Sequence, residues 1–248
     1  MLFDPRPKES LEDLFDREEE VKLLRKTVNT PITLLLGVRR VGKTSLLKAF
    51  LNSLETPHLY LDLRVLEEGG YSRAQLYKLL SSSVSNCTSR WRRILEFFRS
   101  VKGVRISGFE VEFDWRERAL TLTSILDKLN DYALETEEGF IVISLDEAQI
   151  LRFLEGGKGR IDFRSILAYA YDNLGGLRFI LTGSEVGLLL GFLRLDDASS
   201  PLYGRYISII RVEKFPRKLS IEFLRKGFRE ANLDVSEDIL EAIVDRVD

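Results

Sequence analysis

Apolar positions along the chain follow two alternating patterns. Mainly apolar segments of strand length occur at 32–36, 59–63, 140–145, 177–182 and 206–212. Between these runs, apolar side chains recur every three or four residues, which is the spacing of one face of a helix. Strands that alternate with helices favour a parallel sheet covered by helices on both faces. We therefore predict an α/β fold with three layers, α/β/α, and a five-stranded parallel sheet.

Two stretches depart from this alternation. Around Gly108, residues 103–113 alternate between apolar and polar side chains, which predicts a hairpin inserted between helices. From Phe215 onward only helical spacing remains. We predict one domain over residues 1–213 and the beginning of a helical lid domain over 214–248. At the other end, Asp16 and Glu19 have the spacing of a capping pair at the start of a helix.

Composition limits the classes of protein that the chain can belong to. The 248 residues include 44% hydrophobic and 31% charged residues, typical of a globular protein, and the net charge of −2 gives no overall reason to bind nucleic acid or an anionic membrane. Cys87 is the only cysteine, which excludes an intramolecular disulfide and a cysteine-rich metal site. The sequence shows neither a membrane-spanning run nor a signal peptide, so we expect a cytoplasmic protein without a membrane partner.

The strongest chemical signal is the segment GVRRVGKT at residues 37–44, which fits the pattern G-x-x-x-x-G-K-[ST] and lies between a predicted strand and a predicted helix. Its two glycines allow successive backbone N–H groups to face phosphates, and the helix adds its positive amino-terminal end. Lys43 is expected to reach the β and γ phosphates, and Thr44 to bind Mg²⁺, with Ser45 as the weaker alternative. The predicted nucleotide contacts are Gly37, Val38, Arg39, Arg40, Val41, Gly42, Lys43, Thr44 and Ser45.

A second acidic motif follows the run at 140–145, which ends in Asp146 and Glu147. Asp146 is expected to hold Mg²⁺ through water, and Glu147 to orient and polarise the water that attacks ATP. The alternative is that both residues only cap the next helix. A metal-binding Asp146 next to a water-polarising Glu147 predicts a Mg²⁺-dependent ATPase. A GTPase is disfavoured because the sequence has no Asn-Lys-x-Asp segment.

Three further polar residues are weaker candidates. Ser184 is the first choice, and Thr182 the second, for a hydroxyl that contacts the γ phosphate or the attacking water; for Ser184, capping of a helix is an equal alternative. Arg205 is a candidate arginine finger, acting within its own chain or on a neighbouring subunit through self-association. Its alternative is an ordinary surface arginine.

Taken together, these motifs resemble the archaeal ATPase family of the AAA+ and STAND group. The segments that carry the resemblance are 15–20, 37–44, 146–149, 182–185 and 204–205. It implies ATP and ADP with Mg²⁺ as ligands, and a P-loop strand that lies between the last strand and the strand ending at Thr182. It also implies that residues 1–30 lie on the adenine side, with Phe15 and Arg17 near the base, although a plain role at the start of a helix is equally open for them.

In that family a Gly-x-Pro segment and a winged-helix domain normally follow the lid, and the sequence reaches Asp248 before either. We therefore expect a missing carboxy-terminal part. The first functional hypothesis is a nucleotide-controlled regulatory switch with an unidentified protein partner. The alternatives are a DNA-associated ATPase of the replication-initiator type, which would bind DNA through the missing domain, and a small-molecule kinase with an acceptor site at Asp62–Arg64. Glu147 favours water over such an acceptor.

Overall fold

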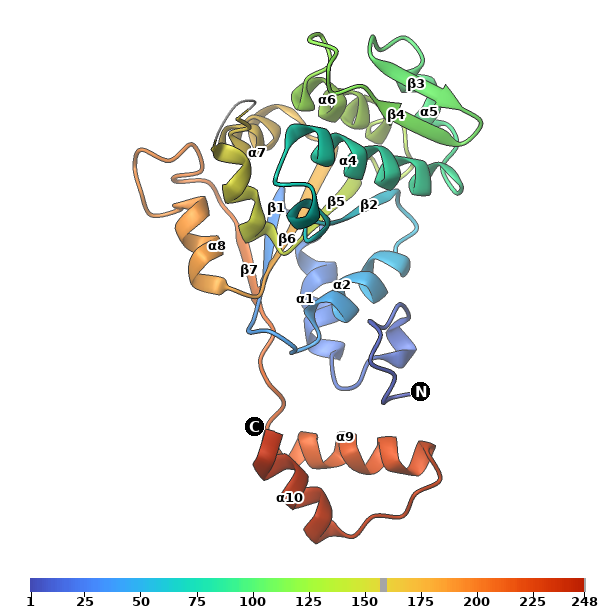
Figure 1. The fold of residues 1–248 in the computed structure, drawn as a ribbon, viewed down its shortest axis with the longest axis vertical. Coiled ribbons are helices and arrows are strands. Elements are labelled where there is room, and N and C mark those ends of the chain that lie inside the picture. The colour runs from blue at the N-terminus through green and yellow to red at the C-terminus, as the bar shows by residue number, and fades with distance from the viewer. Residues whose placement is uncertain (157–159, 248) are drawn as a thin grey trace.

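Five parallel strands form the centre of the computed structural model, which describes residues 1–156 and 160–247 (Figure 1). Their order across the sheet is β2-β5-β6-β1-β7, and every neighbouring pair is parallel. This confirms the predicted fold class, including the position of the P-loop strand β1 between β6 and the last strand. The strands are β1 (Ile32–Leu36), β2 (His58–Asp62), β5 (Ile141–Asp146), β6 (Leu177–Gly183) and β7 (Ser208–Arg211).

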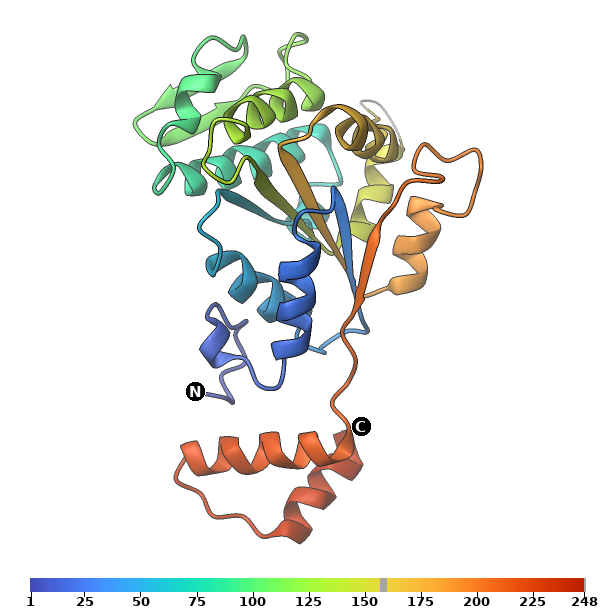
Figure 2. The same cartoon turned by 180° about the vertical axis from the view of Figure 1, so that it is seen from behind.

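Helices cover both faces of the sheet, and its inner strands are therefore mainly apolar and buried at almost every position. Successive side chains of a strand point to opposite faces. In β1, Leu34 and Leu36 therefore join one core while Leu35 joins the other. The face of Leu35 is covered by α1 (Glu18–Thr27) and α2 (Lys43–Asn52). The opposite face carries α4 (Arg73–Thr88), α5 (Ile94–Phe98), α6 (Leu122–Ala133), α7 (Phe163–Asn173) and α8 (Val186–Leu193) (Figure 2).

The predicted hairpin is an antiparallel pair, β3 (Val104–Ser107) and β4 (Glu110–Phe113), which turns at Gly108 with a φ of 61°. It packs against α4 through unusual hydrogen bonds from backbone to side chain. The backbone N–H of Val111 donates to Ser85 Oγ at 2.8 Å, and that of Phe113 donates to Ser81 Oγ at 2.9 Å. Serine hydroxyls of α4 thus satisfy backbone donors of β4 that lack a strand partner.

Two helices, α9 (Arg217–Glu230) and α10 (Glu237–Val247), lie beyond the carboxyl edge of the sheet and follow an extended segment after β7 (Figure 1). They meet the rest of the chain through the amino-terminal segment. The ring of Phe3 lies 5.8 Å from that of Phe223 and 5.2 Å from that of Phe228, and the backbone N–H of Leu2 donates to Glu230 at 2.6 Å. The domain division at 213/214 stays a prediction, and the last residue of the predicted lid, Asp248, lies outside the described residues.

Some boundaries differ from the sequence prediction. Asp16 does not cap α1, because the helix begins at Glu18 with Arg17 as its N-cap residue and no capping bond from a side chain. The remaining short elements are η1 (Leu11–Asp13), α3 (Val65–Glu68) and η2 (Ala148–Glu155). Among the described residues, no helix is both long and apolar enough to cross a membrane.

Candidate functional site

The P-loop connects β1 to α2 at the carboxyl edge of the sheet, and its two glycines are required by its geometry. A Cβ atom on Gly37 would lie 2.4 Å from the carbonyl oxygen of Val212, so the loop can pass β7 only without a side chain there. Gly42 is the N-cap residue of α2 and has a φ of 92°, a conformation that favours glycine. The first amide groups of α2 have no partner within the helix and point toward the loop.

Lys43 is folded back into the P-loop. Its Nζ donates to the carbonyl oxygens of Gly37 at 2.7 Å and Val38 at 2.8 Å, and the residue is only 5% exposed. Burial lowers the pKa of the Lys43 ammonium, and the charges of Glu147 and Asp146 oppose this shift. The lysine therefore holds the loop in shape through bonds that a phosphate could replace.

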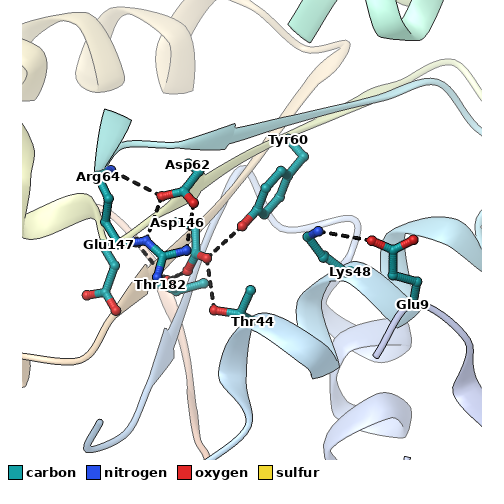
Figure 3. A network of polar contacts seen from close by, with 9 residues as sticks. All are labelled: Glu9, Thr44, Lys48, Tyr60, Asp62, Arg64, Asp146, Glu147 and Thr182. Atoms are coloured by element: carbon teal, nitrogen blue, oxygen red, sulfur yellow. Dashed lines mark hydrogen bonds and ion pairs between the residues drawn. The ribbon is translucent and has the colours of Figure 1, made fainter. Parts of the chain in front are cut away.

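Asp146 is the centre of a hydrogen-bond network at the end of β5 (Figure 3). Its Oδ2 accepts from Thr44 Oγ1 at 2.9 Å and from the hydroxyl of Tyr60 at 2.8 Å, and its Oδ1 accepts from Thr182. Burial, followed by the charge and hydrogen bond of Asp146, raises the pKa of Tyr60, so its hydroxyl stays protonated and donates. Tyr60 was not anticipated from the sequence.

The side-chain oxygens of Thr44 and Asp146 are chemically suited to bind Mg²⁺. They lie 2.9 Å apart, and Thr44 lines the cavity at the P-loop. Both are hard oxygen donors of the kind that Mg²⁺ prefers, and Mg²⁺ is commonly held by one or two protein oxygens together with substrate phosphates and water.

Glu147 follows Asp146 in a left-handed backbone conformation, with a φ of 58° and a ψ of 50°. Its Oε2 accepts from Ser184 Oγ at 2.6 Å, from the backbone N–H of Ser184 at 3.2 Å and from Gln149 Nε2 at 2.5 Å. Burial would raise the pKa of Glu147, but these bonds and the charge of Lys43 outweigh burial and lower it. Glu147 is therefore held as a carboxylate at the rim of the cleft.

Neither capping alternative describes these residues. Glu147 is the N-cap residue of η2 but makes no capping bond with its side chain. Glu185, rather than Ser184, is the N-cap residue of α8. Thr182 instead connects the two carboxylates, because its hydroxyl donates to Asp146 and accepts from the backbone N–H of Glu147 at 3.0 Å. The structure thus brings Ser184 and Thr182 to the Asp-Glu pair.

A cavity of about 780 Å³ opens over this arrangement. Its walls include Lys43, Thr44, Glu147 and Ser184, and on the far side Arg64. Arg64 is paired with Asp62 through Nε at 2.8 Å and Nη2 at 2.6 Å, and this pairing raises the pKa of the guanidinium. The Asp62 carboxylate is therefore paired with Arg64 and is not free to bind the acceptor substrate of a small-molecule kinase.

A second cavity of about 620 Å³ adjoins the first along the P-loop. Phe15 and Arg17 line it, together with Phe223 and Val244 from the helical pair α9 and α10. The two cavities therefore form one continuous cleft that runs from the amino-terminal segment to the Asp-Glu pair. The residues that line both are Pro5, Arg39, Arg40, Gly42 and Ser45.

Arg17 joins three parts of this cleft. Its Nη2 donates to the carbonyl oxygens of Val41 at 2.9 Å and Glu213 at 3.1 Å, and its guanidinium lies 4.2 Å from the centre of the Phe215 ring. Phe15 packs edge-on against Phe215 at 5.6 Å. Arg17 is thus buried by contacts with protein, and its role is wider than the plain start of a helix.

The amino-terminal segment also reaches the start of α2, where the backbone N–H of Lys8 donates to Ser45 Oγ at 3.1 Å. The Ser45 hydroxyl is therefore occupied by the protein itself. This favours Thr44 over Ser45 as the hydroxyl beside Asp146.

The structure does not bring Arg205 to the site. Its guanidinium is paired with Asp172 at 3.1 and 2.5 Å. Arg205 precedes β7 and Asp172 precedes β6, so both lie at the amino edge of a parallel sheet whose carboxyl edge carries the P-loop. Arg205 therefore does not reach the cleft of its own chain, because the length of the strands lies between them. This corrects the expectation of a contact within the same chain. A contact with a neighbouring subunit stays a prediction.

Comparison with known proteins agrees with this geometry. A family model described as an ATPase domain predominantly from Archaea matches residues 14–248. A Walker-type ATPase of Pyrococcus abyssi is 44% identical, with a TM-score of 0.80 over 99% of this chain and 67% of that chain. Drosophila ORC bound to DNA shares the fold at 15% identity, with a TM-score of 0.54 over 93% of this chain and 55% of that chain. No curated protein matches the sequence. The chain belongs to the family of ATPase domains found predominantly in Archaea.

Proposed function

We propose that this ATPase domain binds ATP with Mg²⁺ in the P-loop cleft, hydrolyses it, and uses the nucleotide state as a regulatory switch. The observation that carries the proposal is the convergence of three elements on one cavity. Lys43 comes from the P-loop, Glu147 from the end of β5, and Ser184 from the end of β6. Asp146 is buried directly behind this wall and is bonded to Thr44, which lines the same cavity. These are the groups that phosphoryl transfer to water requires: a cation for the phosphates, a metal-binding carboxylate and a base.

The continuous cleft suggests how ATP lies in it. The phosphates would bind at the amino end of α2, where unpaired backbone amides, the helix dipole and Lys43 attract anions. The base would then lie in the second cavity, beside Phe15 and Arg17. The cavity volumes of about 780 and 620 Å³ are each in the range of small-molecule sites.

Thr44 and Asp146 would hold the magnesium ion, which supplies neutralisation of phosphate charge when it is bound. Lys43 would leave the carbonyl oxygens of Gly37 and Val38 and donate to phosphate oxygens instead. Glu147 would accept a proton from the attacking water, since its lowered pKa keeps it ionised at neutral pH. Ser184 fixes the direction of that carboxylate.

The switch is supported by the composition of the second cavity. Phe223 and Val244 belong to α9 and α10, whereas Val41 and Gly42 belong to the P-loop, and all four line the same space. A nucleotide in that space would contact both parts at once, so a shift of the nucleotide on loss of the γ phosphate would change its contacts with the helical pair as well as with the P-loop. ATP and ADP would therefore stabilise different positions of the helical pair, and a protein partner would recognise the difference.

The alternatives receive less support. The likeness to DNA-bound ORC is a likeness of fold, and the net charge of −2 gives no electrostatic argument for DNA. The kinase alternative loses its acceptor site because Asp62 is paired with Arg64. A cytoplasmic setting and self-association through Arg205 remain parts of the proposal; the single buried thiol of Cys87 fits a reducing compartment.

The test is Glu147→Gln, which keeps the size of the side chain and removes the base. We expect turnover to fall by about 10²- to 10⁴-fold while ATP binding is retained. Glu137→Gln, an exposed glutamate away from the cleft, is the matched control and should keep full turnover. Retention of most of the turnover in Glu147→Gln would refute the assignment of Glu147 as the base.

A further inference from the structure

Gln149 bonds to Glu147 through one polar atom of its side-chain amide, and the other polar atom has no partner among the described residues. The side chain is 5% exposed, and its Nε2 donates to Glu147 Oε2 at 2.5 Å. Its other polar atom, Oε1, is buried and has no hydrogen-bond partner among the described residues. Turning the amide over would place Oε1 against Glu147 Oε2, two acceptors at bonding distance, so the observed orientation is the one that the carboxylate imposes.

A buried acceptor without a partner is costly, and an apolar side chain of the same size would avoid that cost. The retained amide therefore indicates that the bond to Glu147 serves a purpose other than stability. The same short turn holds a second unfavourable feature, since Glu147 is a non-glycine residue with a φ of 58°. Such local costs concentrate where a side chain must be held in one position for function.

The hydrogen bonds on Glu147 are distributed unevenly between its two oxygens. Oε2 accepts from Gln149 Nε2 and from both the hydroxyl and the backbone N–H of Ser184. Oε1 accepts none from residues in the described parts of the chain. With Oε2 fully occupied, the carboxylate can rotate only by breaking several bonds, and Oε1 is the oxygen left for a substrate molecule.

Building on the proposed hydrolysis, we propose that Gln149 is a positioning residue which, together with Ser184, clamps Glu147 through Oε2 and reserves Oε1 for the attacking water. In the step that follows, the water oxygen forms the new bond to the γ phosphorus. The bond from phosphorus to the bridging oxygen breaks, and its electron pair leaves with ADP. The proton of the water goes to Glu147 Oε1. Gln149 lines the same cavity and acts on this step through its bond to Glu147.

The decisive variant is Gln149→Met, which keeps the length of the side chain and removes both the donor and the unpartnered acceptor. We expect its unfolding midpoint in urea to stay close to that of the wild type, because removal of the buried unpartnered acceptor offsets the loss of the bond to Glu147. We expect the dissociation constant for ATP to stay within about twofold and kcat to fall by about tenfold or more. Gln75→Met, at the other glutamine of the chain, is the matched control and should keep kcat.

Two titrations separate positioning from a merely structural role. Because Gln149→Met removes a donor from the carboxylate, the acid limb of the kcat profile should move to higher pH. The carboxyl signal of Glu147 in the nucleotide-free protein should titrate at higher pH as well, which tests the clamp without turnover. A Gln149→Met protein with wild-type kcat and unshifted titrations would overturn the clamp, and so would one whose loss of kcat is matched by a lowered unfolding midpoint. Absence of ATP turnover in the wild type would instead refute the proposed function, and the nucleotide-free titration would still report on the clamp.

Discussion

Thr44 and Asp146 are 102 residues apart in the sequence, yet Thr44 Oγ1 donates to Asp146 Oδ2 at 2.9 Å. The bond joins the first turn of α2 to the end of β5. In the sheet, β6 lies between β5 and β1, the strand that leads into α2. The bond places the two oxygens that we assign to Mg²⁺ in contact with each other. The bond therefore aligns the P-loop with the acidic motif.

Thr44→Val tests this assignment, because valine keeps the shape of threonine and lacks the hydroxyl. We expect turnover in the presence of Mg²⁺ to fall by at least about tenfold, while ATP binding without the metal is unchanged. Thr27→Val is the control, since the Thr27 hydroxyl bonds only to carbonyl oxygens of its own helix. The measurement is the rate of hydrolysis against Mg²⁺ concentration. An identical curve for Thr44→Val and the wild type would show that Thr44 does not bind the metal.

Gly37→Ala should destabilise the protein because its Cβ would lie 2.4 Å from the carbonyl oxygen of Val212. Val212 is tied to β1 by a 2.7 Å bond from its N–H to the carbonyl oxygen of Leu36, so it cannot move away freely. The expected loss is about 1–3 kcal/mol in the free energy of unfolding. Gly187→Ala in α8, where nothing lies within 4 Å of the added atom, should be neutral or slightly stabilising. Equal unfolding curves for Gly37→Ala and the wild type would contradict the close approach.

The stability of the protein should depend on the ionisation of Glu147. The pKa of this group is lowered from 4.5 in the folded protein, so the unfolded chain takes up the proton first as the pH falls. The carboxylate thus contributes stability that is fully present above about pH 4.5 and is lost as the pH falls through the lower folded pKa. In urea, the free energies of unfolding of the wild type and Glu147→Gln should differ by a constant amount between about pH 7 and about pH 5. Below that range the wild type should lose stability relative to Glu147→Gln. A difference that stays constant would mean that the pKa of Glu147 is not lowered.

Arg17→Met should weaken both the fold and nucleotide binding. It removes the bonds to Val41 and Glu213 and leaves the half-buried carboxylate of Glu20, bonded to Arg17 at 2.7 Å, without its cation. We expect a loss of about 3 kcal/mol in the free energy of unfolding and a higher dissociation constant for ATP. The control is Arg25→Met on the same helix, where the arginine is exposed. An Arg17→Met protein as stable as Arg25→Met would show that Arg17 does not join the P-loop to the segment after β7.

The layers and the order of the strands could be predicted because they depend on strong local patterns. Apolar runs such as 32–36 and 140–145 are buried on both faces, and only a sheet covered on both sides satisfies them. The P-loop and the Asp-Glu pair were likewise visible, since each occupies consecutive positions directly after a strand. The parallel direction of the strands then brings these positions to one edge.

The rest of the site depends on contacts that no local pattern encodes. Tyr60 reaches Asp146 only because β2 pairs with β5 in a register that sets Tyr60 opposite Ser144. Gln149 became relevant through the left-handed turn at Glu147, and a turn of this kind has no clear sequence signal outside glycine and asparagine. The sequence left open whether Arg205 acts within its own chain or on a neighbouring subunit, and the ion pair with Asp172, which only the fold brings together, separates it from the cleft of its own chain.

Binding of ATP by the P-loop underlies every role assigned to this cleft, and isothermal titration calorimetry with ATP and Mg²⁺ measures it. We predict saturable binding at one site per wild-type chain, loss of that binding in Lys43→Ala, and unchanged binding in Lys26→Ala, which alters an exposed lysine of α1. No heat of association in the wild type, or the same affinity in Lys43→Ala, would contradict the central claim that this cleft is a triphosphate site.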